Sequence, residues 1–567
     1  MNTQITHERV DDIPLLLHLM IEELGLHTIV DEQWPRHGNW LGLSLGQVTV
    51  TWLAHMLSEC NHVMSHVQDW SNHLKHTLAH FLGQELRETD LSDDRLAEVI
   101  RVLSLDAVWH PIEQAVTQRM IRVYRLPKER VRLDGTTVSI HSNDSSSILF
   151  RRGHSKDHRP DLPQFKAMLA TLDPLGMLVG VDVVPGQRAD DGLYVPLIER
   201  LRTTLGPAGL LYIGDCKMSA LGTRAYLQAT DNYYLVPLAQ VGRVPAELEQ
   251  WIAAALEGQV QLEPLLDMDG QTVLGEGYEL VRTQAADGPD GPICWQERIL
   301  VVHSESFAAA ARRGLQQRLS KAQAALLALT PPPGRGRRQF TEEAPLREAV
   351  QAILTRYKVE GLLIVRLRRE VQRRSIRAYG GQPARMEEQH RYVVQAYPNT
   401  SAIDRYERTL GWRVYATNAP SQNLPLDQAV QAYRDEWLVE RNCARLKGRP
   451  LSLAPVWLTR DDHAIGLTRL LTLAARLLAL VEYQVRRQLA ETQQTLAGLY
   501  PGQSTRTTDQ PTTERLLRAF KHITLTITQT GKQIKRHITP LSDLQTTILR
   551  LLDCPRNLYG QLAIDSS

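Results

Sequence analysis

Cysteine is scarce in this sequence, and its spacing excludes two common ways of stabilising a fold. The five cysteines among 567 residues are scattered and include no C-x-x-C pair. A disulfide framework or a structural zinc site needs grouped cysteines. We therefore expect neither of them, and we expect a protein of a reducing compartment, the cytoplasm.

A signal peptide and a long uncharged hydrophobic run are also missing. The first residues lack the series of basic, apolar and small side chains that marks a secretory signal. The most apolar segment, residues 465–483, carries Arg469 and Arg476, which are expensive at the centre of a bilayer. We interpret this segment as a buried helix of a protein that has no membrane partner.

An overall excess of one charge is absent, because 65 Lys and Arg balance 63 Asp and Glu. The distribution along the chain is uneven. Residues 331–393 contain fourteen basic against seven acidic side chains, and residues 484–537 contain nine against three. Such blocks can neutralise the phosphates of a nucleic acid. A solvated face or a linker explains either block equally well.

The patterns that are present predict an α/β protein of several parts, since the chain is too long for a single core. Helical apolar spacing dominates at the start, where Ser44 is suited to cap a helix. Three strand-like runs joined by turns then precede helix, strand, helix and strand, which indicates a mixed sheet with helices on its faces. The α/β pattern is interrupted and later resumes with a long helix at 425–448. The expected domains are 1–125, helical, for DNA binding or dimerisation; 126–240, the first part of a catalytic core; 241–405, a partly β insertion; 406–495, the remainder of the core; and 496–567, a helical tail.

Two aspartates occupy similar positions in this pattern. Asp134 lies within the strand-like run "RVRLDGTTVSI", and Asp215 ends the run "GLLYIGD". In open α/β sheets functional residues gather at strand ends. Two neighbouring carboxylates repel each other unless a divalent cation lies between them. The competing interpretation is that each aspartate caps a turn or a helix, above all Asp215.

The long helix carries polar side chains on one face. Residues three or four apart share a helical face. The residues on this face are Tyr433, Glu436, Glu440, Ala444 and Lys447. Ordinary solvated charge explains a single Glu–Lys pair, but the aromatic side chains of Tyr433 and Trp437 favour a partly buried face.

The ordered set resembles the DDE transposases of bacterial insertion sequences. It is most similar to the subgroup whose signature is Tyr, two residues, Arg, three residues, Glu, six residues, Lys. Tyr433, Glu440 and Lys447 match at the right spacing, whereas Glu436 occupies the Arg position. Asp134 in "LDGTTVS" and Asp215 in "YIGDCKMSALG" resemble the first and second Asp motifs of the family.

The resemblance implies a fold, a chemistry and a set of partners. The implied fold is a ribonuclease-H-like mixed sheet with flanking helices, interrupted by a partly β insertion domain and preceded by a helical domain. The implied activity is Mg²⁺-dependent cleavage and strand transfer at terminal inverted repeats, with Mn²⁺ as a substitute and a homodimer holding double-stranded transposon ends and target DNA. The implied metal ligands and catalytic residues are Asp134, Asp215 and Glu440, and the implied DNA contacts are Tyr433, Lys447 and Arg441.

Other interpretations stay open at this point. Glu436 places a negative charge where the family has a phosphate contact, which suggests a catalytically impaired relative that still binds DNA. A different metal-dependent phosphohydrolase leaves the basic insertion unexplained. We interpret three histidines near the first strands as exposed turn residues rather than as site residues: His141, His154 and His158.

Overall fold

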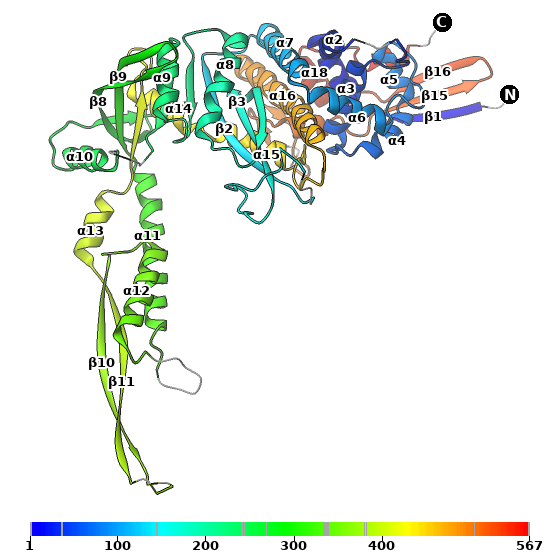
Figure 1. Ribbon diagram of the computed structural model, residues 1–567. Helices are drawn as coiled ribbons and strands as arrows, with labels where there is room; N and C mark the ends of the chain where they lie inside the picture. Colours follow the sequence, from blue (N-terminus) through cyan, green and yellow to red (C-terminus); the bar gives the residue numbers. More distant parts are fainter. Residues whose placement is uncertain are drawn as a thin grey trace.

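The computed structural model contains a helical region, a large mixed sheet and a projecting arm (Figure 1). It describes residues 3–35, 38–142, 146–239, 242, 244–267, 269–332, 340–378, 380–381, 383–503 and 505–564. The basic stretch "GRGRR" and most of the turn "SNDSS" therefore lie outside the described residues.

The helical region predicted at the N-terminus is present. Its elements are α1 (Ile13–His18), a π-helical turn (Leu19–Glu23), α2 (Leu26–Gln33), α3 (Leu45–Glu59), a 3₁₀ turn (Met64–His66), α4 (Val67–Asn72), α5 (Lys75–Leu82), α6 (Asp93–Leu103) and α7 (Asp106–Tyr124). The predicted cap is confirmed, because Ser44 Oγ accepts the N–H of Gln47 at 3.1 Å and the Gln47 side chain accepts the N–H of Ser44. This reciprocal pair satisfies two helix-end donors.

The predicted mixed sheet with flanking helices is also present, and it is larger than expected. Its strand order is β4-β3-β2-β5-β6-β12-β9-β8-β7. The strands are β2 (Arg130–Ser139), β3 (Gln164–Leu172), β4 (Met177–Pro185), β5 (Leu211–Gly214), β6 (Tyr233–Pro237), β7 (Glu263–Leu266), β8 (Val273–Gly288), β9 (Gly291–His303) and β12 (Trp412–Thr417). Strands β2 to β4 are antiparallel, whereas β5 and β6 run parallel to β2, an arrangement consistent with a ribonuclease-H-like core.

Helices from distant parts of the chain cover this sheet. The helices are α8 (Tyr194–Leu205), α9 (Leu221–Ala229), α10 (Val244–Leu256), α14 (Leu426–Arg434), α15 (Trp437–Lys447) and α16 (Asp461–Thr492). Helices α7, α8 and α16 pack against β4, and α15 packs against β2 and β3. The buried strands β2 and β3 are rich in apolar residues on both faces, as expected for strands covered on both sides.

The segment expected to form one insertion domain is divided by the structure. Strands β7 to β9 extend the main sheet, because β9 pairs with β12 along Trp412–Thr417. The rest projects as an arm, which we define as residues 305–408 (Figure 1). The arm contains α11 (Glu305–Ala328), α12 (Glu343–Tyr357), β10 (Leu363–Ile376), β11 (Arg385–Pro398) and α13 (Thr400–Arg408).

The prediction of a single helix at 425–448 is wrong in one respect, because the structure has two helices there, α14 and α15, with an interruption between them. At the interruption the N–H groups of Glu436, Leu438 and Val439 bond to carbonyls three residues earlier. This tighter pattern is that of a 3₁₀ turn, and it changes the helix direction locally. Glu436 thereby occupies the position that precedes the first turn of α15.

Helix α16 is the buried helix that the sequence predicts. By length and composition α16 is apolar enough to cross a membrane, but 94% of its most apolar window is buried inside the protein. The bent helix pair Ile13–Glu23 and Leu26–Gln33 passes the same test of length and composition. Arg476 of α16 is buried and donates to Glu113 at 2.7 Å, and Arg469 of the same helix donates to the carbonyl of Leu103 at 3.0 Å. Both guanidinium groups therefore have hydrogen-bond partners inside the protein and link α16 to the N-terminal helices.

The helical tail predicted for 496–567 is only partly helical. The tail contains β13 (Leu496–Ala497), β14 (Thr507–Thr508), α17 (Thr513–Arg518), β15 (Thr524–Thr530), β16 (Gln533–Ile538), α18 (Asp543–Leu551) and a 3₁₀ turn (Gly560–Ala563). Strand β15 lies between β16 and β1 (Thr3–Arg9) at the N-terminus. Buried Leu525 and Ile527 alternate with threonines, which is the period of a strand rather than of a helix.

Candidate active site

Asp134 and Asp215 lie beside each other on neighbouring parallel strands. Strands β2 and β5 are in register at Leu133 and Gly214, so Asp134 on β2 is matched by Asp215, the residue directly after β5. Gly214 leaves room for the turn after β5, because a Cβ there would meet the Met218 side chain at 2.4 Å. The predicted pair of carboxylates is therefore brought together by the sheet.

Asp215 is oriented entirely through one of its oxygens. Its Oδ1 accepts the hydroxyl of Tyr194 at 2.7 Å and the backbone N–H groups of Lys217 at 2.8 Å and Met218 at 3.4 Å. The turn-capping role that the sequence left open is thus real. Helix α9 begins later, after Ala220, so Asp215 does not cap it. No hydrogen bond from a described residue reaches Oδ2, which stays available to a ligand.

Asp134 is held in a similar way. Its Oδ1 accepts the N–H of Gly135 at 2.7 Å and the ammonium of Lys156 at 3.1 Å. Burial raises the pKa of the Asp134 carboxyl, and the nearby Asp215 adds to the rise, while Lys156 opposes it. Among the described residues no donor reaches Oδ2 of Asp134 either.

A third carboxylate shares the cavity between these strands and helix α15. The cavity holds about 10 Å³, close to the space of one water molecule, and its walls include Asp134, Asp215, Tyr433 and Glu436. Burial raises the pKa of the Glu436 carboxyl, and the negative charges of Glu440, Asp134 and Asp215 raise it further. Carboxylates gathered in this way favour a bound cation.

Glu440, the predicted third ligand, lies one helical turn beyond Glu436 and is exposed. It does not line the cavity. It does share the helical face that looks towards β2, because Glu436 and Cys443 lie on either side of it along α15 and the charge of Asp134 acts on both. Glu440 is therefore a neighbour of Glu436 on α15, and its charge acts on the Glu436 carboxyl.

The three predicted DNA contacts have different surroundings. Tyr433 is buried and packs against Tyr415 with ring centroids 4.7 Å apart. Lys447 forms an ion pair with Asp157 at 2.7 Å. Arg441 donates to the buried Glu482 of α16 at 2.5 Å, which directs its guanidinium into the protein.

Helix packing fixes the position of this cluster. Arg132 on β2 makes two 2.7 Å hydrogen bonds to Asp173 and also donates to the carbonyl of Ala432, at the end of α14. The Asn442 side chain donates to the carbonyl of Gly176 at 2.6 Å. The interruption that carries Glu436 is thus tied to the sheet on both sides.

The three histidines near the first strands take no part in the cluster. His154 and His158 are exposed, as interpreted from the sequence. His141 is half-buried and its ring lies 5.1 Å from that of Trp457.

Comparison with known proteins identifies the domain that carries these residues. Residues 125–475 match the model of the family described as "Transposase DDE domain". The chain belongs to the DDE transposase family. The match contains both aspartates and helix α15, and it implies an enzyme of DNA phosphodiester cleavage and strand transfer.

Two further comparisons add little. A cryo-EM structure of a piggyBac transposase synaptic complex with hairpin DNA aligns over 100% of this chain and 88% of that chain, at 9% identity and a TM-score of 0.36. This likeness is too weak to support an argument. No curated protein matches the chain.

DDE transposases typically use a divalent metal, and the chemistry of the cluster fits one. Asp134 and Asp215 each present an unengaged Oδ2, and carboxylate oxygens are the ligands that Mg²⁺ prefers. Within the described ranges no three His, Cys, Asp or Glu side chains are already arranged around one ion position.

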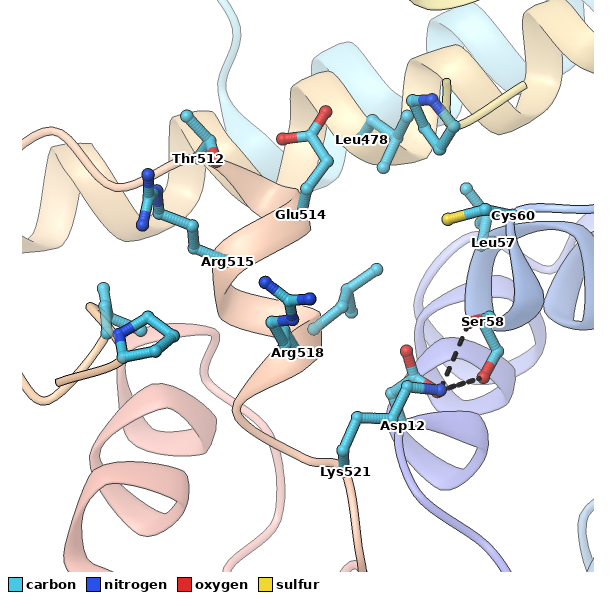
Figure 2. Close-up of a pocket in the computed structure, with 14 residues that line it drawn as sticks. Asp12, Leu57, Ser58, Cys60, Leu478, Thr512, Glu514, Arg515, Arg518 and Lys521 are labelled. Atoms are coloured by element: carbon cyan, nitrogen blue, oxygen red, sulfur yellow. Dashed lines mark hydrogen bonds between the residues drawn. The ribbon is translucent and has the colours of Figure 1, made fainter. Parts of the chain in front are cut away.

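A roomier cavity of this DDE transposase lies away from the carboxylate cluster. This cavity of about 490 Å³ lies between the N-terminal helices, α16 and α17 (Figure 2). There Lys521 donates to the backbone oxygen and the hydroxyl of Ser58, at 3.2 and 3.3 Å. These contacts join the C-terminal segment to α3.

The sequence predicted the helical face of Glu436 but not its place in the cavity wall beside the aspartates. Lys156 and Tyr194 were missed because each reaches its aspartate from a separate segment. Only the folded arrangement reveals such pairs.

Proposed function

We propose that this DDE transposase cleaves DNA at the terminal inverted repeats of a bacterial insertion sequence and joins the ends to target DNA. The observation that supports the proposal is the pair Asp134 and Asp215, side by side on β2 and β5 with one free oxygen each. The Tyr433, Glu440 and Lys447 spacing supports the subgroup.

Asp134, Asp215 and Glu440 are the residues that would hold Mg²⁺, with Mn²⁺ as a substitute. When bound, a pair of such ions stabilises the attacking and leaving oxygens of an in-line displacement at phosphorus. Glu440 is preferred to Glu436 as the third ligand because its exposed side chain lies where DNA can reach it. Glu436 adds negative charge beneath it.

The remaining residues orient the carboxylates and the DNA. The Tyr194 hydroxyl holds Asp215 through Oδ1 and leaves Oδ2 available to a ligand. Lys156 and Lys447 bring positive charge to the rim of the cluster, where a phosphate group would lie. Such phosphate contacts position DNA without reading its sequence. Double-stranded DNA, a homodimer that holds two ends and a cytoplasmic location complete the proposal.

The test is cleavage of a duplex that carries the inverted repeat of the flanking DNA. Asp134→Asn should lower Mg²⁺-dependent nicking by roughly 10³-fold or more, because a ligand of the ions is lost. Asp161→Asn makes the same change at an exposed ion pair with Arg159, and it should cut at the wild-type rate. Cleavage by Asp134→Asn at that rate would refute the proposal.

A second candidate is a catalytically impaired relative that binds the same ends. One observation favours it: no three carboxylates among the described residues surround a common ion position. The two adjacent aspartates, each with an Oδ2 that no described donor reaches, speak against it. End binding without nicking in Mg²⁺ or Mn²⁺ would decide for the impaired relative.

A further inference from the structure

The arm ends in a two-stranded ribbon with one covered and one bare face. Strands β10 and β11 form a sheet of their own and extend beyond α11 and α12 (Figure 1). Leu363, Val394 and Ala396 are buried against a small core shared with those helices. That core covers the inner face of the ribbon.

The outer face is formed by the alternate residues. Arg366 pairs with Gln395 and Arg368 with Val393 across the ribbon, and the side chains of such partners share a face. Arg366 and Arg368 are both exposed. Ile364 and Tyr397, at the same face, are 43% and 49% exposed. Nothing described covers this surface.

Two arginines of the outer face have no ion-pair partner among the described residues. Arg366 and Arg368 make no ion pair with any residue that the structure describes, whereas Glu370 pairs with Arg391. Arg373, whose side chain lies on the opposite face by the strand period, is paired with Glu388 at 2.8 Å. Charged side chains on exposed strands often prevent aggregation between strands. That role does not require positive charge in particular, and lysine is the side chain that commonly fills it. Arg366 and Arg368 are therefore available to bind phosphates, for which the guanidinium group is well suited.

We infer that the outer face of the β10–β11 ribbon is a docking surface for duplex DNA. A two-stranded ribbon fits the major groove, about 12 Å wide, because its strands lie roughly 4.8 Å apart. Strand β10 has fourteen residues, and at about 3.3 Å each it spans more than one turn of the duplex. The inference rests on the proposed function, since it names a second place where the same substrate is held.

The test measures DNA binding by the full chain without divalent metal, so it does not depend on cleavage. The variant Arg366→Ala/Arg368→Ala is compared with the wild type on a 40-base-pair duplex of random sequence over a range of salt concentrations. Each lost phosphate contact lowers the slope of log affinity against log salt by about 0.9. We expect a slope smaller by about 2 and binding weaker by roughly tenfold at low salt.

A matched control removes the same charge at the other end of the molecule. Arg550→Ala/Arg556→Ala changes two exposed arginines in and beyond α18, far from the ribbon (Figure 1). It should keep the wild-type slope. Equal slopes for the ribbon variant and the wild type would overturn the inference. A ribbon variant that instead loses self-association at unchanged DNA affinity would assign this face to a second copy of the chain. Nicking by the ribbon variant is measured separately, so failure here leaves the carboxylate proposal intact.

Discussion

Lys156 donates a hydrogen bond from its ammonium to Oδ1 of Asp134 at 3.1 Å, from a segment that lies between β2 and β3. The same ammonium donates to the carbonyl oxygen of Gly135, and the Lys156 N–H donates to the hydroxyl of Thr137 at 3.0 Å. Burial opposes the charge on Lys156, but Asp134 and Asp215 raise the pKa of its ammonium. Lys156 is therefore an internal counter-ion of the carboxylate pair.

Removing this counter-ion should increase the affinity of the DNA-free protein for a divalent cation. Lys156→Gln takes away a charge that competes for Asp134, and one partly buried charge is worth about 1.4 kcal/mol, or roughly tenfold in affinity. The measurement is Mn²⁺ titration by electron paramagnetic resonance. Lys217→Gln removes an exposed charge two residues after Asp215 and should leave the affinity unchanged. Equal affinities for wild type and Lys156→Gln would contradict the counter-ion role.

The two glutamates of α15 should differ in their effect on cleavage. Glu440→Gln removes the proposed third ligand and should lower nicking by roughly 10³-fold. Glu436→Gln keeps that ligand and removes only a neighbouring charge, so we expect a loss of about tenfold. Rates on the inverted-repeat duplex measure both variants. The reverse order of effects would assign the third ligand to Glu436, which lines the cavity.

Glu482 should be essential for the stability of the core. This carboxylate is buried on α16 and receives Arg441 at 2.5 Å, Arg445 at 2.6 Å and Arg486 at 2.8 Å. Glu482→Gln leaves Arg441 and Arg486 without their ion-pair partner and Arg445 with Glu514 alone, and breaking a buried pair typically costs about 3–5 kcal/mol. Thermal unfolding measures the loss. Glu491→Gln, at an exposed pair with Arg487 on the same helix, should cost less than about 1 kcal/mol. Similar melting temperatures for both variants would contradict this account.

The N-terminal helical region should lose stability in acid through His55. Burial lowers the pKa of its imidazole from 6.5 to about 4, and His66 contributes repulsion. Because the folded pKa is lowered, the unfolded chain binds a proton first as the pH falls below 6.5. The stabilisation is complete above pH 6.5 and should decrease by about 2 kcal/mol at pH 5.

The variant His55→Gln removes the titrating group from the same buried position on α3. Its denaturant midpoint should change less between pH 7 and pH 5 than that of the wild type. If both proteins show the same dependence on pH, another group causes the acid sensitivity of this region.

Local periodicity predicted the parts of the fold that it governs. The alternation around Asp134 and the apolar run before Asp215 gave strands β2 and β5 and placed both aspartates correctly along the chain. The three-and-four spacing on α15 placed Glu436 and Glu440 on one face. These features depend on neighbours within a few residues, which a sequence displays directly.

Pairing between distant segments could not be predicted in this way. Strand β9 joins the main sheet through β12, more than a hundred residues later, and β1 pairs with β15 near the other end of the chain. The alternation of Leu525 and Ile527 with threonines indicates a strand, but it covers only a few residues of a tail that is otherwise basic and polar. The bond from Lys156 to Asp134 likewise appears only in the folded chain.

The central claim is that Asp134, Asp215 and Glu440 together hold divalent cations, and anomalous diffraction from Mn²⁺-soaked crystals of the full chain with its DNA end tests it most directly. The account predicts anomalous peaks about 2.1 Å from Oδ2 of Asp134 and of Asp215, with a carboxylate of α15 as a further ligand. A bound DNA end with no manganese peak between β2 and β5 would contradict it.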